Sequence, residues 1–148
     1  MQITDAVAID AERAHVFEVF CDLDSAAANL DAITKIEVLA GPAQLNVGTK
    51  WRETRIMFGR EATEEMWVTA YETNTSYVVE AESNGTRYRT EYWFSAEGKG
   101  TLVTMTFSGR PVSLGARLAS PIGVLFIGAT KKALHQDLVQ LKRACELA

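Results

Sequence analysis

The 148-residue sequence has few of the residues that metal sites and nucleophilic sites need. It contains two histidines and two cysteines. His15 and His135 stand alone on expected helices, and no HExxH motif occurs, so their spacing argues against zinc. Cys21 and Cys145 lie near opposite ends of the chain without a CxxC motif, which favours reduced, structural thiols. Since GxSxG, P-loop and GxGxxG motifs are also missing, we expect no metal and no organic cofactor.

The chain also lacks a strong charge of one sign and a long apolar run. Its formal net charge of −4 offers no basic surface for nucleic acid. The longest uncharged apolar stretch, residues 121–129, is about half as long as a transmembrane helix. The first residues do not resemble a signal peptide, so we expect a cytoplasmic protein. A content of 47% hydrophobic and 23% charged residues is typical of a globular domain, here a single one over residues 1–148.

The periodicity of apolar residues predicts an α+β domain. Asp10 is placed to cap a short helix over residues 11–21, and a second short helix over residues 26–33 begins near Asp24. A long amphipathic helix is expected over residues 121–146. Segments with strand-like alternation cover residues 3–10, 35–39, 49–58, 62–71, 77–83, 87–95 and 101–108. Short turns between the later strands predict an antiparallel meander, because parallel neighbours need long crossovers.

This order of elements resembles the helix-grip fold of the SRPBCC, or START-like, superfamily. Four segments are similar to the bacterial polyketide cyclase/dehydrase-like branch: AIDAERAHVFEVFCDLDS, VGTKW, GKGTLVTMTFSG and ALHQDLVQLKRACE. The resemblance implies a curved seven-stranded antiparallel sheet around a long C-terminal helix, with two short helices after strand one. It also implies that strand one pairs with the last strand, and that space remains between sheet and helix. A fold of this kind does not by itself name a reaction.

Alternation along the strands predicts which side chains face the interior. Charged residues prefer water, so Tyr88 and Tyr92 should point inward while Arg89 and Glu91 point outward. Met66 is also assigned inward, although Trp67 competes with it. The predicted ligand-binding residues are Trp51, Arg55, Met57, Met66, Tyr77, Val79, Tyr88, Tyr92, Phe94, Met105, Phe107, Phe126 and Thr130.

Charged residues on the strand over residues 49–58 form a second candidate feature. If Trp51 and Met57 face the interior, the period of two carries Glu53 and Arg55 inward with them. A buried charge is costly unless it is paired. An Arg55–Asp137 contact across the cavity would settle both charges and leave a guanidinium able to hold a ligand carbonyl or carboxylate. The alternative is that this strand end is exposed and its charges are hydrated.

The inward aromatic and methionine residues form either a dry packed core or the lining of a cavity. With a cavity, the first functional hypothesis is binding or carriage of a small hydrophobic molecule that is aromatic, polyketide-like or lipid-like. The second is a metal-free enzyme of the polyketide cyclase/dehydrase type, which needs an acid or base deep in the lining. Few inward polar residues are available, which favours binding. The third hypothesis, a co-chaperone-like interaction domain, follows from other branches of the resembled fold.

A partner surface is the last feature that the sequence indicates. On the long helix, Val124, Leu125 and Val139 project onto an arc turned away from the expected sheet. Outward apolar residues often mark contacts between molecules. This arc therefore indicates either a gate or the contact surface of a homodimer.

Overall fold

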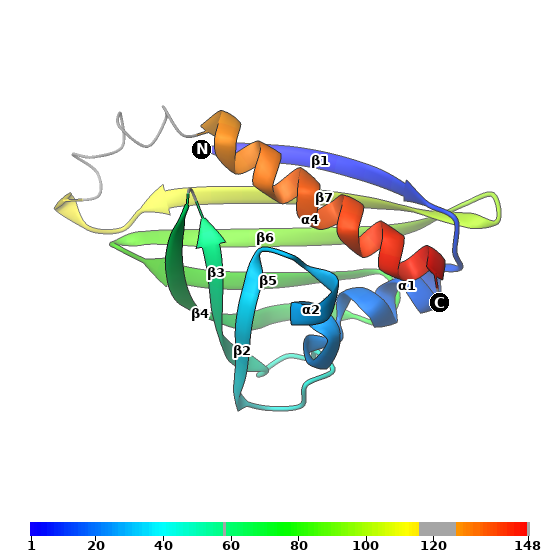
Figure 1. Cartoon of the computed structure of the whole chain (residues 1–148), viewed down its shortest axis with the longest axis horizontal. Helices are drawn as coiled ribbons and strands as arrows, with labels where there is room; N and C mark the ends of the chain where they lie inside the picture. The colour runs from blue at the N-terminus through cyan, green and yellow to red at the C-terminus, as the bar shows by residue number, and fades with distance from the viewer. Residues whose placement is uncertain (58, 116–126, 148) are drawn as a thin grey trace.

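The computed structural model describes residues 1–57, 59–115 and 127–147. Its sheet has seven strands in the order β1-β7-β6-β5-β4-β3-β2, with every pairing antiparallel. The strands are β1 (Gln2–Ile9), β2 (Ile33–Ala40), β3 (Lys50–Met57), β4 (Arg60–Glu72), β5 (Ser76–Ser83), β6 (Thr86–Glu97) and β7 (Gly100–Pro111). The predicted meander and the pairing of the first strand with the last are both confirmed (Figure 1).

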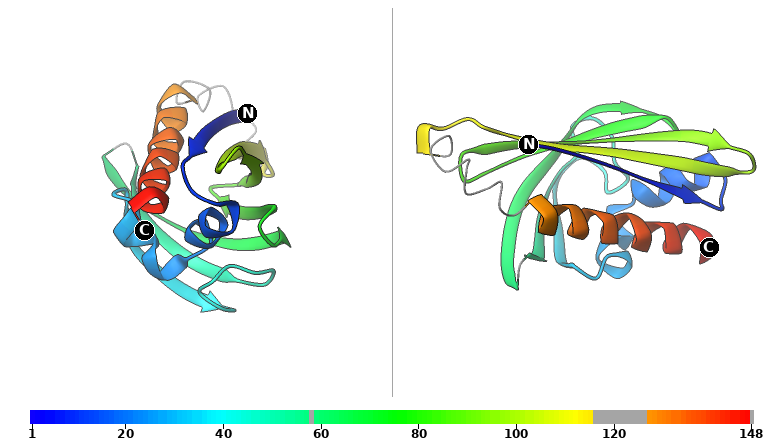
Figure 2. Two further views of the ribbon diagram at one scale, coloured as in Figure 1. Left: turned by 90° about the vertical axis from the view of Figure 1, so that its right-hand side faces the viewer. Right: turned by 90° about the horizontal axis from the view of Figure 1, so that it is seen from above.

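Helices α1 (Arg13–Phe20), α2 (Leu23–Asn29) and α4 (Ile127–Leu147) lie on the concave side of the sheet (Figure 2). The expected helix-grip architecture is therefore confirmed. Helix α4 is tied to the edge strand β1, where Lys142 Nζ donates to the Ala8 carbonyl at 2.7 Å. At its other side, Gln140 and Asp31 exchange hydrogen bonds of 3.0 and 3.1 Å. The helix thus spans the opening between the two ends of the curved sheet.

The start of α1 differs from the prediction. Asp10 does not cap this helix; the residue before the helix is Glu12, whose side chain makes no capping bond. Instead, the Asp10 backbone N–H donates to the Glu146 carboxylate at 2.8 Å. The prediction failed because a carboxylate from the far end of the chain bonds the backbone of this turn, which local sequence does not reveal.

The second helix is also earlier than predicted. Helix α2 runs from Leu23 to Asn29, and Ile33 already begins β2. The capping residue is Asp22, whose side chain accepts the Asp24 backbone N–H at 3.0 Å. Apolar residues spaced by three, as at Leu30 and Ile33, suit a helix and an inward-turning strand start equally, so the spacing alone gave the wrong boundary.

A packed core fills the end of the sheet that α1 covers. Phe17 of α1 lies edge-on to Phe94 and Tyr77, with ring centroids 5.0 and 5.9 Å apart. Leu138 of α4 and Met105 of β7 are fully buried in the same cluster. The apolar half of α4 and the aromatic half of α1 therefore complete a core at one end of the concave face.

Both cysteines belong to this core. Cys21 and Cys145 are free thiols and are buried, and burial raises the pKa of each to about 12. The expected structural role agrees with this placement. His15 lies beside Cys145, with its Nε2 3.1 Å from the Cys145 carbonyl oxygen. His135 pairs with Asp5 of β1, with Nδ1 2.7 Å from the carboxylate oxygen.

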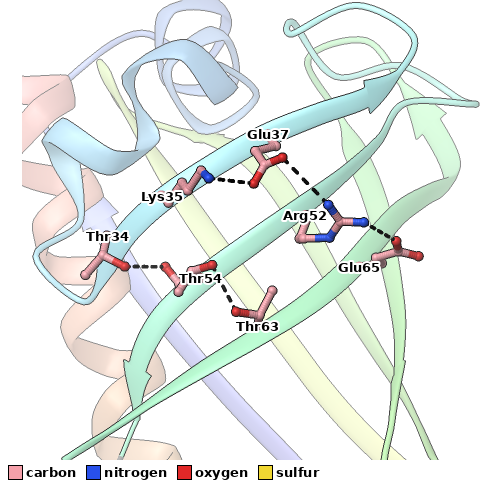
Figure 3. Close-up of polar contacts among 7 residues, drawn as sticks. All are labelled: Thr34, Lys35, Glu37, Arg52, Thr54, Thr63 and Glu65. Carbon is pink, nitrogen blue, oxygen red and sulfur yellow. Dashed lines mark hydrogen bonds and ion pairs between the residues drawn. The ribbon is translucent and has the colours of Figure 1, made fainter.

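The convex face of β2, β3 and β4 carries a polar network (Figure 3). Arg52 contacts Glu65 at 3.0 Å and Glu37 at 3.6 Å, and the hydroxyl oxygens of Thr54 and Thr63 are 3.0 Å apart. Since side chains alternate along a strand, this outward set determines that the odd-numbered residues of β3 face inward.

Three residues with predicted roles lie outside the described part of the chain: Phe126, predicted to bind ligand, and Val124 and Leu125, predicted to form a gate or a dimer contact. The first six residues of the predicted terminal helix, 121–126, are likewise outside it. Among the described helices, none is both long and apolar enough to cross a bilayer.

Candidate functional site

A cavity of about 780 Å³ lies between the concave face of the sheet, α2 and α4, which lines it from Ile127 to Leu141. This volume falls within the range of about 300–1,000 Å³ that small-molecule sites occupy. Helix α4 contributes a short row of residues to the lining, including Thr130, Leu134 and Asp137. The rest of the concave face beyond the packed core forms the opposite wall. The interior is therefore part dry core and part cavity.

Aromatic rings form one wall of this cavity. Tyr77 and Tyr92 are stacked across β5 and β6, with ring centroids 4.9 Å apart. Tyr88 and Phe107 stack at 5.6 Å across β6 and β7. Burial raises the pKa of Tyr77 and Tyr92 well above the ordinary value, so both phenols stay neutral. The wall presents broad, uncharged ring surface to any occupant.

Most of the predicted ligand-binding residues line the cavity: Trp51, Arg55, Met57, Met66, Tyr77, Val79, Tyr88, Tyr92, Phe107 and Thr130. Met66 faces inward as assigned, and Trp67 instead stacks outside under the Arg87 guanidinium, 5.7 Å from its ring centre. Phe94 and Met105 also face inward, but they lie in the packed core and do not line the cavity. The side chains of α1 cover that end of the sheet, and strand alternation cannot reveal this.

The charged residues of β3 meet α4 as predicted. Arg55 donates from Nε to Glu53 at 2.9 Å and from Nη1 to Asp137 at 3.0 Å. The three side chains are only 17%, 8% and 15% exposed, in the order Arg55, Glu53, Asp137. The predicted contact is confirmed, and the alternative of a hydrated strand end is wrong.

Burial and neighbouring charges have opposite effects on the pKa values of Arg55 and Asp137. Burial opposes ionisation of Arg55, but the charges and hydrogen bonds of Glu53 and Asp137 more than offset it, so the Arg55 pKa lies above its ordinary value. For Asp137, burial outweighs the attraction of Arg55, and its pKa is raised. The guanidinium is therefore a permanent cation.

Glu64 is the functional residue that the sequence analysis missed. It lines the cavity from β4, directly opposite Glu53 in the strand register. Burial, and secondarily the charge of Glu53, raise its pKa, while Arg55 acts in the other direction. The signal was present, because Glu64 is two residues from Met66 and must share its face. The assumption that charged residues face water concealed it.

Trp51 adds a polar group without a partner. It is 4% exposed and lines the cavity, and its indole Nε1 has no hydrogen-bond acceptor among the described residues. A buried donor of this kind is uncommon in folded proteins. The lining thus combines apolar rings with a guanidinium, carboxyl groups and one unpaired N–H. Within the described ranges, no group of three or more His, Cys, Asp or Glu residues could hold a metal ion.

Solved structures of similar architecture come from several sources. TTHA0849 from Thermus thermophilus has a TM-score of 0.77 at 17% identity, over 98% of this chain and 97% of that one. A START superfamily protein from Mycobacterium smegmatis has a TM-score of 0.68 at 13% identity, covering 98% and 94%. The di-domain ARO/CYC BexL has a TM-score of 0.75 at 17% identity, over 99% of this chain and 50% of that one. At such identities the likeness shows the fold alone.

Sequence comparison supplies the family. No curated protein sequence matches the chain. A family model described as "Polyketide cyclase / dehydrase and lipid transport" matches residues 1–146. Because this match covers nearly all of the chain, and the sheet and helix have the arrangement that the sequence resemblance implied, the chain belongs to the polyketide cyclase/dehydrase and lipid transport family.

Proposed function

We propose that the protein binds or carries a small hydrophobic molecule in the cavity beneath α4. The observation that carries this proposal is the cavity of about 780 Å³ with its stacked tyrosine wall. Burying apolar ligand surface there is worth about 25 cal/mol per Å² removed from water. A broad, flat ligand would use this wall best, because ring stacking adds to the burial.

The test is a substitution that fills the cavity. Its effect is followed by the binding of an uncharged fluorescent probe, phenylnaphthylamine. Thr90 lines the cavity in the middle of β6, so Thr90→Phe should place a ring in the ligand space and abolish probe binding. Thr106 of β7 pairs with the outward-facing Glu91, so Thr106→Phe adds the same ring to the convex face. The control should bind the probe as the wild type does. Equal binding by both variants would refute the proposal.

The natural ligand can be sought by native mass spectrometry of the protein purified from its own host. A retained ligand would appear as a reproducible added mass, and Thr90→Phe purified in parallel should lack it. An added mass that persists in Thr90→Phe would belong to another site.

A second candidate is a cyclase acting on a poly-ketone in the same cavity, and the acidic group of Glu64 favours it. As a carboxylate, Glu64 would accept a proton from the carbon between two carbonyls. That carbon would then attack the carbon of a further carbonyl group to form the new C–C bond, and the oxygen of the attacked carbonyl would take up the proton. Loss of water would follow. Glu64→Gln should then bind a synthetic poly-ketone but no longer give the product lighter by one water. Unchanged turnover in Glu64→Gln would exclude this mechanism.

A further inference from the structure

The polar end of the cavity has more carboxyl groups than cations. Glu53, Glu64 and Asp137 line it, and Arg55 is the one Lys or Arg side chain among the described lining residues. Two other acidic residues in the lining have partners nearby: Asp22 bonds Ser25, and Glu80 lies 3.9 Å from Arg87. With all groups ionised, three carboxylates face one guanidinium.

The convex face of the same strands is different. There Lys50 and Arg52 share Glu65. Lys35 lies 2.9 Å from Glu37, which also contacts Arg52 (Figure 3). Every carboxylate of this outer network has a cation beside it. The surplus of negative charge is therefore a property of the concave face and not of this part of the sheet as a whole.

Of the three carboxyl groups at the polar end of the cavity, Glu64 is the one without a partner in the described part of the chain. Arg55 donates hydrogen bonds to the carboxylates of Glu53 and Asp137. Glu64 has no hydrogen bond or ion pair within the described residues, and its cross-strand neighbour is a second glutamate, Glu53. Like charges directly opposite one another destabilise an antiparallel pair. A cation placed between the two would remove this repulsion.

Trp51 is an independent sign that this wall is incomplete without a ligand. Its Nε1–H is buried in the lining and has no acceptor among the residues that the structure describes, and it lies two residues before Glu53 on the same face of β3. Leaving such a donor unpaired destabilises the protein, because the group has lost its hydrogen bond to water. A ligand that carries an oxygen or nitrogen acceptor would remove this cost. A ligand that complements this wall would therefore carry one hydrogen-bond acceptor and one positive charge.

We propose that the ligand of this cavity is a lipophilic amine, with its ammonium group beside Glu64 and Glu53, an acceptor atom toward Trp51 Nε1, and its apolar body against the tyrosine wall. This inference rests on the proposed function and specifies the ligand class. An ammonium would bring the local charges to two positive and three negative. An anionic ligand would add to the negative surplus in a poorly solvated site, where charge interactions are strong.

The experiment compares three ligands that share one hydrophobic body and one ether oxygen as acceptor: naphthyloxyethylamine, naphthyloxyethanol and naphthyloxyacetic acid. Each displaces phenylnaphthylamine from the wild-type protein at neutral pH. Hydrogen bonds to a charged group are stronger than neutral ones, so the amine should bind roughly tenfold or more tightly than the alcohol. The acid should bind most weakly. In Glu64→Gln the preference for the amine over the alcohol should fall to a few-fold at most.

Glu65→Gln is the matched control, because Glu65 is the next residue in the chain and points to the convex face. It should keep the full preference for the amine. A pH titration of the wild type provides a second measurement without any substitution. As pH falls through the raised pKa of Glu64, which faces Glu53, Arg55 and Tyr88, the carboxylate becomes neutral and the preference should shrink while the amine stays protonated.

The outcomes separate the two proposals. Binding of the alcohol without any preference for the amine, or tighter binding of the acid, would overturn the amine inference and leave the hydrophobic site intact. An amine preference that survives in Glu64→Gln would also overturn it. Failure of all three compounds and of the probe to bind folded protein would overturn the proposed function itself.

Discussion

Arg55 shows how a single residue can connect strand β3 to helix α4. Its guanidinium contacts Glu53 on its own strand and Asp137 on the helix. Removing one partner of a buried charge cluster leaves the others unpaired, at a cost of about 3–5 kcal/mol. We expect Arg55→Met to lose about 3 kcal/mol in its free energy of unfolding, measured by urea denaturation near neutral pH.

Adding Asp137→Asn to the Arg55→Met variant should restore part of the lost free energy of unfolding, because it removes one unpaired charge. The loss should also shrink in acid, since protonation neutralises the abandoned carboxylates. If Arg55→Met is as stable as the wild type, the network contributes nothing to folding, and Arg55 would then be free to serve only as a ligand anchor.

Glu64 should give stability a pH dependence of its own. Its pKa in the folded protein lies above the ordinary value of 4.5, so the folded state binds the proton more tightly than the unfolded state. Its contribution is therefore complete below about pH 4.5 and is lost as pH rises through the folded pKa. Glu64→Gln should become more stable relative to the wild type over this interval, by about 0.2–1 kcal/mol.

The measurement is the difference in unfolding free energy between Glu64→Gln and the wild type from pH 4 to pH 8. A flat difference across that range would mean that Glu64 is solvated and does not sense Glu53. At neutral pH, Glu65→Gln should instead be less stable than the wild type, because it removes the partner of Arg52 and Lys50.

The sequence predicted Arg55 and missed Glu64, and the difference has a physical cause. Arg55 shares a face with Trp51 and Met57, two apolar residues, so the hypothesis that these two face the interior carried Arg55 inward with them. Glu64 lies on β4, where Trp67 competes with Met66 for the inward side. The choice became clear only when the structure placed Trp67 under the Arg87 guanidinium on the convex face.

At the scale of elements, the turn between β6 and β7 holds the edge strand β1 very closely. A Cβ added to Gly100 would lie 2.6 Å from the Ile9 carbonyl oxygen, a backbone atom that cannot move away cheaply. Gly100→Ala should therefore push β1 from β7 and cost about 1–3 kcal/mol. The measurement is the midpoint of thermal or urea unfolding.

Gly128 of α4 provides the matched control. An added Cβ there meets no atom within 4 Å among the described residues, so Gly128→Ala should gain about 0.5 kcal/mol from helix propensity. Equal stability of the two alanine variants would show that β1 tolerates displacement at this corner.

Element types were easier to predict than the way elements cover one another. Alternation along β6 gave the inward direction of Tyr88, Tyr92 and Phe94 correctly, because charged neighbours occupy the other face. A bulge in β4 could not be predicted. The register shifts between Val68 and Ala70, and this shift turns Tyr71 toward Phe17 of the core, with ring centroids 5.4 Å apart. A single extra residue reverses the face of every later side chain in its strand.

The whole molecule divides into a packed end and a hollow end along one helix. In α4, Leu138 and Cys145 are buried in the packed core, while Thr130 and Leu134, nearer its start, border the cavity, and Leu141 belongs to both. Sequence periodicity places all of these residues on one apolar arc and cannot distinguish the two ends. The distinction arises because α1 fills the concave face at one end, leaving open space at the other.

This division predicts different costs for the same substitution four residues apart. Leu138 is 1% exposed within close-packed side chains, so Leu138→Ala opens a new cavity and should cost about 3 kcal/mol. Leu134 already borders open space, so its truncation removes fewer contacts and should cost about 1 kcal/mol. The two costs are compared by urea denaturation of the protein without ligand.

Ligand binding should show the reverse order. Leu134→Ala changes the wall that a ligand touches, so it should alter the affinity for phenylnaphthylamine, whereas Leu138→Ala should leave that affinity near the wild-type value as long as the protein is folded. The physical reason is that stability depends on the packed end of the helix and binding on the hollow end. A Leu134→Ala variant as destabilised as Leu138→Ala, with unchanged probe affinity, would mean that α4 closes over a single continuous core.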